Sequence, residues 1–190
     1  MSKNWHIYLG EIPHSNNGPF WVSFESDPRL KKNKSNIYGR CLPCIRNLYE
    51  QLQKGSTEIH LGTAYDCWKI TAIMEGIDQC ISLLSQFEMR FPTGHVYGKL
   101  GTGRTDSKNR VVVFHADKET ERDRIQDAVI HCLSKMDTET NVLISRGCAA
   151  LHESILGDWR EWKPVTPVRF PEKVDKQLDY LKRLLFRSSM

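Results

Sequence analysis

Two cysteines stand close together in the segment Cys41-Leu-Pro-Cys44, at the start of a predicted helix. Thiols with this Cys-x-x-Cys spacing form the reactive pair of thiol oxidoreductases, and they also supply half of a zinc site. The chain has no second Cys-x-x-Cys pair and no His-x-x-x-His pair, and a polar stretch precedes Cys41 where a redox motif would follow a buried strand. We therefore keep three interpretations of Cys41 and Cys44: structural, zinc-binding with help from Cys148 and His152, and redox.

A third cysteine ends the segment Ser145-Arg-Gly-Cys148, which lies between a predicted strand and a predicted short helix. The positive end of a helix dipole lowers the pKa of a thiol and makes the thiol a better nucleophile. Arg146 in the same segment would bind an anionic substrate, although the Cys-x5-Arg spacing of a phosphatase loop is absent. Cys148 is therefore a candidate catalytic nucleophile, and the alternative is a packed thiol after a turn at Gly147.

His60 and His115 are candidates of a second kind, because imidazole pairs act as general acid and base near neutral pH. His60 lies in a predicted strand at 57–61, and His115 ends a predicted strand at 110–115. Alternation does not decide which face His115 occupies, since valines stand on both faces of its strand. If His115 faces away from the helices, the two histidines lie on adjacent strands and would cleave phosphodiesters without a metal. The alternative is two unrelated polar side chains.

A glycine-rich, basic connection joins predicted strands at 95–100 and 110–115. Glycines let backbone N–H groups surround a phosphate, and lysine and arginine supply positive charge. The P-loop spacing is absent and a strand follows the glycines, so this is not a P-loop. Tyr97 beside Lys99 adds a platform for base stacking, as in sheet-based binders of single-stranded RNA. The predicted phosphate-binding residues are Tyr97, Lys99, Gly101, Gly103, Arg104, Lys108, Arg110 and Arg146. A hairpin without a ligand is the alternative.

The elements that must position these residues follow the order strand, helix, strand, strand, helix, strand. The predicted ranges are 57–61, 66–87, 95–100, 110–115, 117–136 and 141–145. This order predicts an α+β protein with a ferredoxin-like βαββαβ core, in which two helices cover one face of a four-stranded antiparallel sheet.

We expect residues 1–190 to form a single domain. Its N-terminal extension, 1–56, would contain a β-hairpin (strands 5–10 and 20–25) and a helix at 42–53. The core would span 57–146. The C-terminal extension, 147–190, would be helical and would pack on the core.

Composition places limits on the function. With 39% hydrophobic and 26% charged residues in a chain of 190, the protein is globular, and a net charge of +4 is only a mild basic excess. No apolar run is long enough to span a bilayer, and no export signal opens the sequence. We therefore expect a cytoplasmic protein with no membrane partner, whose six cysteines form no disulfide framework.

Three functions follow from these observations. The first is a nucleotide- or RNA-binding protein that holds phosphate through the basic hairpin. The second is a metal-independent phosphodiesterase or nuclease with His60 and His115 as its acid–base pair. The third is a thiol-redox or zinc protein centred on Cys41 and Cys44. The sequence leaves open whether the chain is an enzyme, and we keep a homodimer through the open sheet face or the last helix as an alternative.

Overall fold

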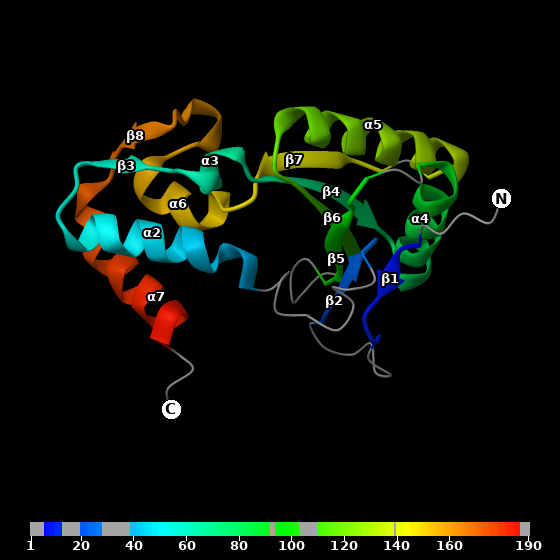
Figure 1. Ribbon diagram of the computed structural model, residues 1–190, viewed down its shortest axis with the longest axis horizontal. Coiled ribbons are helices and arrows are strands. Elements are labelled where there is room, and N and C mark those ends of the chain that lie inside the picture. The colour runs from blue at the N-terminus through cyan, green and yellow to red at the C-terminus, as the bar shows by residue number, and fades with distance from the viewer. Residues whose placement is uncertain are drawn as a thin grey trace. The chain divides into compact units, whose positions relative to one another are not determined.

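The computed structural model describes residues 6–12, 20–27, 39–91, 94–102, 110–138 and 140–186. The chain divides into two compact units (Figure 1). Unit 1 comprises residues 1–38 and 69–144, and unit 2 comprises residues 39–68 and 145–190. The described residues form an antiparallel sheet of six strands, a separate pair of strands and six α-helices, which confirms the predicted α+β class. Within the described ranges, no helix combines the length and apolar character needed to cross a membrane.

The larger sheet is the centre of unit 1. Its strands are β1 (Tyr8–Leu9), β2 (Trp21–Glu25), β4 (Trp68–Met74), β5 (Tyr97–Gly101), β6 (Arg110–Ala116) and β7 (Val142–Arg146). Their order across the sheet is β1-β2-β5-β6-β4-β7. The helices α4 (Ile77–Arg90) and α5 (Glu119–Lys135) pack on each other and both contact β6 (Figure 1). They therefore cover the same face of the sheet.

The predicted start of the core was wrong. Residues 57–61 do not join the larger sheet, and the first half of the predicted helix at 66–87 is strand β4. Successive residues in β4 alternate strictly between buried and half-buried positions, as a strand with one covered face requires, and all the buried ones are apolar. Ile70 and Met74 also stand four apart, which resembles helical spacing and explains the error. From β4 onward the elements run strand, helix, strand, strand, helix, strand.

Unit 2 is built from helices around a small sheet. Its helices are α2 (Leu42–Gln53), α3 (Thr63–Asp66), α6 (Ala149–Leu156) and α7 (Val174–Phe186), and its single-turn helices are η1 (Gly39–Cys41), η2 (Trp159–Glu161) and η3 (Pro171–Lys173). Strand β3 (Glu58–His60) pairs antiparallel with β8 (Val165–Pro167). Helices α2 and α7 lie side by side (Figure 1). The predicted helix at 42–53 is confirmed, and α6 is the short helix predicted to follow Cys148.

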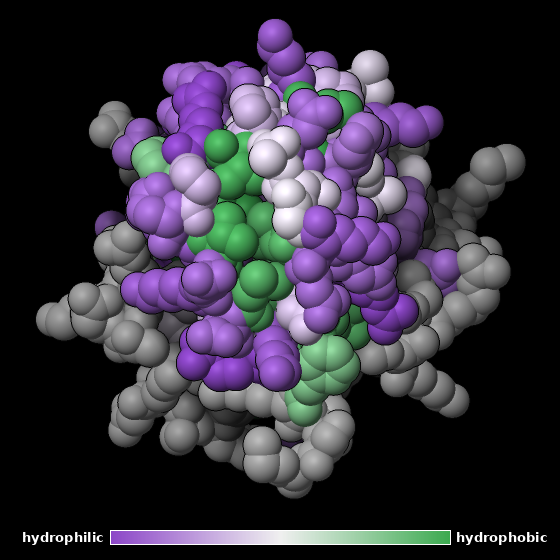
Figure 2. All heavy atoms as spheres, turned by 90° about the vertical axis from the view of Figure 1, so that its left-hand side faces the viewer, coloured by the Kyte–Doolittle hydropathy of each residue, from purple (hydrophilic) through white to green (hydrophobic). Residues whose placement is uncertain are grey.

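Amphipathic helices give unit 2 its own core. Leu48 and Leu52 of α2, Ile59 of β3, Ile155 of α6 and Leu181 of α7 pack in one cluster, each 3% exposed or less. The polar sides of these elements face solvent. Figure 2 accordingly shows mostly hydrophilic side chains, around a smaller hydrophobic group, on the face of unit 2 turned toward the viewer. Unit 2 consists of two segments, 39–68 and 145–190, and both contribute to this cluster. The unit therefore forms only when these distant parts of the chain come together.

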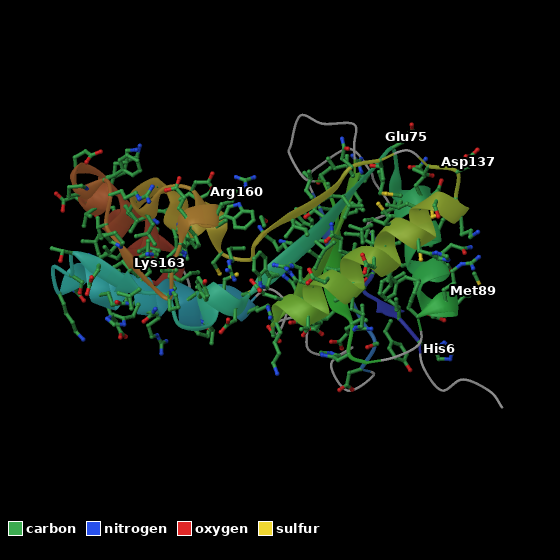
Figure 3. The ribbon with its side chains drawn as sticks, turned by 90° about the horizontal axis from the view of Figure 1, so that it is seen from above. His6, Glu75, Met89, Asp137, Arg160 and Lys163 are labelled. Atoms are coloured by element: carbon green, nitrogen blue, oxygen red, sulfur yellow. The ribbon has the colours of Figure 1, made fainter. Side chains whose placement is uncertain are left out.

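The described residues before β1 bind to helix α4 of unit 1. Glu88 on α4 contacts the ring Nδ1 of His6 at 3.1 Å and accepts a hydrogen bond from the backbone N–H of Ile7 at 2.8 Å. In Figure 3, His6 and the neighbouring Met89 accordingly lie on the same side of unit 1. Strand β1 follows and pairs antiparallel with β2, as the predicted N-terminal hairpin requires. The residues between these two strands, 13–19, lie outside the described ranges.

A buried thiol in unit 1 makes the stability of the fold sensitive to alkali. Cys80 on α4 is fully buried, and burial raises its pKa from 9.0 to about 12. Above about pH 9 the unfolded chain releases this proton while the folded chain keeps it, so the free energy of unfolding falls by about 1.4 kcal/mol per pH unit for this thiol. We expect denaturant unfolding at about pH 8 and about pH 10 to show a smaller loss for Cys80→Ala than for the wild type. An equal loss in both proteins would contradict the burial of this thiol.

Candidate thiol site

Three cysteines from two helix N-termini meet in unit 2. Cys41 is the residue at the N-cap of α2 and Cys44 lies in its first turn, while Cys148 is the N-cap of α6. The Cys148 thiol hydrogen-bonds with the thiols of both Cys41 and Cys44. The Thr63 hydroxyl adds a contact to Cys44, with 3.6 Å between Oγ1 and Sγ. The fold thus joins two candidates that the sequence left about a hundred residues apart, and all six cysteines are free thiols.

Local sequence explains why α2 presents this pair. Pro43 stands in the first turn, where its fixed backbone suits a helix start and its missing N–H has no intrahelical partner to lose. Cys41 and Cys44 then lie within one turn of each other at the positive end of the helix. The predicted Cys-x-x-Cys motif at a helix start is therefore present in the structure.

The three thiols divide charge and proton unequally. A hydrogen bond from Cys148 is the main cause that lowers the pKa of Cys44 from 9.0 to about 7, and the Thr63 hydroxyl and the charge of Arg40 lower it further against burial. The pKa of Cys148 is raised, first by its hydrogen bonds to Cys41 and Cys44 and then by burial. Cys44 therefore ionises before Cys148, and Cys148 keeps the proton that it donates to the Cys44 thiolate.

Solvent reaches this cluster at one thiol. Cys44 is 5% exposed and Cys148 is 4% exposed. Among the six cysteines, all of which lie in described residues, Cys41 alone is partly exposed. Of the three residues, Cys41 is therefore the most accessible from solvent.

Cys67 lies at the margin of the same site, which the sequence did not predict because the residue was assigned to a helix. It follows α3, and burial raises the pKa of its thiol. The Arg40 guanidinium is 4.0 Å from Cys67 Sγ, and the backbone N–H of Gly147 donates to the Cys67 carbonyl at 2.7 Å. A Cβ at position 147 would lie 2.3 Å from Cys67 Sγ. Gly147 is thus needed for this close approach and does not serve as a left-handed turn residue.

Arg146 and His152, which the sequence analysis placed beside the thiols, both interact with other groups of the protein. The Arg146 guanidinium is 3.7 Å from the Trp68 ring and 4.2 Å from the Tyr65 ring, and it donates to the Tyr65 carbonyl. His152 is fully buried, and its Nδ1 lies 3.0 Å from the Cys148 carbonyl oxygen. Burial lowers the pKa of His152, so the ring is neutral near pH 7 and Nδ1 donates to that carbonyl. His152 thus holds the first turn of α6 and does not reach toward the thiols as a ligand.

The zinc interpretation finds no support in this geometry. In the part of the chain that the structure describes, no group of three or more His, Cys, Asp or Glu side chains is arranged to hold a metal ion. Zinc binding by Cys41 and Cys44 therefore stays a prediction.

The predicted pairing of His60 with His115 is wrong. His60 lies on β3, which pairs with β8, whereas His115 lies on β6 of the larger sheet. The two histidines belong to different sheets because residues 57–61 find their partner at the other end of the chain. His115 faces away from the helices, since its ring stacks on Tyr97 at 5.9 Å while Phe114 packs against Phe87 of α4.

Basic residues at the base of the predicted phosphate-binding hairpin make cation–π contacts with aromatic rings at or beside the start of β2. Lys99 Nζ lies 4.1 Å from the Trp21 ring centroid, and the Arg110 guanidinium lies 5.7 Å from the Phe20 ring centroid. A Cβ on Gly101 would lie 2.1 Å from the Phe20 carbonyl oxygen, so this glycine permits close packing of strands.

Tyr97 offers little ring surface to a base. It is 6% exposed, and its hydroxyl donates to Asp117 at 3.1 Å. The tip residues Gly103, Arg104 and Lys108 lie outside the described residues, so phosphate binding there stays a prediction.

Comparison of the chain with models of protein families, with curated proteins and with solved structures finds no match in any of the three.

Proposed function

We propose that unit 2 carries a redox-active dithiol, Cys41 and Cys44, which reduces disulfide bonds in a substrate. The observation that carries this proposal is the hydrogen bonding of Cys44 to Cys148 and Thr63, which lowers the pKa of Cys44 to about 7. A thiolate that forms near ambient pH is the effective attacking species in thiol–disulfide exchange. The Cys-x-x-Cys spacing and the partial exposure of Cys41 support the same reaction.

The reaction proceeds in two exchanges. Cys41 gives its proton to the Cys44 thiolate as its sulfur attacks one sulfur of the substrate disulfide and forms a mixed disulfide. The released substrate thiolate takes up that proton from Cys44, which is then a thiolate again. The Cys44 thiolate then attacks the Cys41 sulfur, so that a Cys41–Cys44 disulfide forms and the second substrate thiol leaves. The protein loses two thiol hydrogens and the substrate gains them, so protein oxidation balances substrate reduction.

The surrounding residues have distinct roles in this proposal. Cys148 and Thr63 donate hydrogen bonds that stabilise the resolving thiolate on Cys44. Arg40 adds positive charge that lowers the pKa of the same thiol. Because only Cys41 is partly exposed, access is limited to a small disulfide or to a flexible segment that carries one.

The test is a count of thiols after treatment with glutathione disulfide. We expect the wild type to lose two thiols and form the Cys41–Cys44 bond. We expect the double variant Cys44→Ser/Cys148→Ala to stop at a stable mixed disulfide on Cys41, because both thiols that neighbour Cys41 are absent. Cys132→Ser, which removes a buried thiol of unit 1, is the matched control and should react like the wild type. Unchanged thiols in the wild type, or one tightly bound zinc per chain that protects them, would overturn the proposal.

A separate inference concerns the fold of unit 1. We infer that the segment from β4 to β7 is a ferredoxin-like core, and the strand order β5-β6-β4-β7 supports this inference. Strands β2 and β1 would then extend the core along its β5 edge. This scaffold hosts many functions, so it does not by itself select a substrate.

A further inference from the structure

Cys148 contacts both members of the proposed dithiol. Its thiol hydrogen-bonds to Cys41 and to Cys44, and it belongs to the same packed cluster as these two residues. It enters the site from α6, whereas the other two cysteines come from α2. Its position is held by the hydrogen bond from His152 to its carbonyl and by Gly147, which packs against Cys67. A thiol held in contact with both sulfurs of a disulfide is placed to exchange with it.

We infer that Cys148 is a third redox thiol, which attacks Cys44 in the Cys41–Cys44 disulfide and produces a buried Cys44–Cys148 disulfide. This inference rests on the proposed function. The Cys148 sulfur bonds to Cys44 Sγ as its proton leaves, and the bond between Cys41 and Cys44 breaks. Cys41 departs as a thiolate and takes up a proton. The exchange moves a disulfide within the chain and needs no further oxidant or reductant.

The electrostatics of the cluster allow this step only after the dithiol is oxidised. In the reduced protein the pKa of Cys148 is raised chiefly by its interactions with Cys41 and Cys44. Once those two sulfurs are joined, neither can carry negative charge, and burial alone still opposes ionisation of Cys148. Cys148 therefore acts as a hydrogen-bond donor in the reduced state and as a nucleophile in the oxidised state.

The product differs from the first disulfide in its accessibility. Cys44 and Cys148 are both at least 95% buried, whereas Cys41 is partly exposed. The exchange would place the oxidised bond out of reach of external thiols and return Cys41 to its free form. The regenerated Cys41 thiol could then react with a second substrate disulfide.

A non-reducing gel separates the two disulfides. The protein is oxidised with glutathione disulfide, alkylated in denaturant and examined by electrophoresis and by mass spectrometry of its peptides. A bond between residues about a hundred positions apart closes a large loop and keeps the denatured chain compact, whereas a Cys41–Cys44 bond does not. We expect the oxidised wild type to contain a fast-migrating species in which the Cys44 and Cys148 peptides are joined and Cys41 is alkylated.

The variants distinguish failure of this inference from failure of the proposed function. Cys148→Ser and Cys148→Ala should lose the fast-migrating species but still form the Cys41–Cys44 bond, and Cys132→Ser in unit 1 is the control that should retain it. Oxidised wild type with only the Cys41–Cys44 bond and an alkylated Cys148 would overturn the inference while the proposed function stands. Absence of any bond within the chain would overturn both.

Discussion

Replacing Cys148 by alanine should move the midpoint of Cys44 ionisation upward from about 7, toward the ordinary thiol pKa of about 8.5. The physical reason is that the variant removes the hydrogen bond that contributes most to stabilising the Cys44 thiolate. With a midpoint of about 8.5, the thiolate fraction at pH 7 would fall roughly sixteenfold. The intrinsic nucleophilicity of the sulfur would rise about fivefold, so the rate at which Cys44 attacks a disulfide should fall about threefold. The ultraviolet absorbance of the thiolate, followed against pH, measures the midpoint without requiring access of a reagent.

Two variants make this result specific. Thr63→Val removes the smaller of the two hydrogen bonds to Cys44, so its midpoint should rise less than that of Cys148→Ala. Cys44→Ala should abolish the transition near pH 7 altogether. A transition near pH 7 that persists in Cys44→Ala would assign the low pKa to another thiol and remove the basis of the proposed function.

Replacing Gly98 by alanine should destabilise unit 1 by about 3 kcal/mol or more, because overpacking a buried strand forces backbone and side chains to move. A Cβ at this position would lie 2.0 Å from the Val113 carbonyl oxygen and 2.6 Å from the Phe24 ring. Gly98 pairs with Phe24 on one side and with Phe114 on the other, and these two rings meet edge-to-face across it at 5.1 Å. Thermal unfolding followed by circular dichroism would show the lower midpoint.

The matched control is Gly76→Ala at the start of α4. No atom lies within 4 Å of a Cβ built at Gly76, and its backbone is extended, with φ at −163°. This variant should unfold within about 1 kcal/mol of the wild type. An unfolding midpoint of Gly98→Ala no lower than that of Gly76→Ala would contradict the close packing of Phe24 and Phe114 across β5.

Local patterns in the sequence determined most of the individual elements. The predicted helix at 117–136 corresponds to α5, and the predicted strands at 110–115 and 141–145 correspond to β6 and β7. The helix was predictable because its apolar residues recur at helical spacing, and the two strands were predictable because each is a short run rich in β-branched and other apolar residues. The Cys-x-x-Cys motif was visible for a similar reason, since both thiols lie within one turn of the same helix.

Contacts between distant segments were decided by the tertiary structure alone. Residues 58–60 form a strand in either arrangement, but only packing in unit 2 pairs them with 165–167 and so separates His60 from His115. The face of His115 was ambiguous until Phe114 packed against Phe87. Nor does spacing along the chain reveal that Cys148 meets Cys44, because neither segment has a local pattern that names its partner. Local residue patterns therefore specify the Cys-x-x-Cys pair and the helix start that carries it, whereas the convergence of α2 and α6 creates the hydrogen bonds that lower the pKa of Cys44.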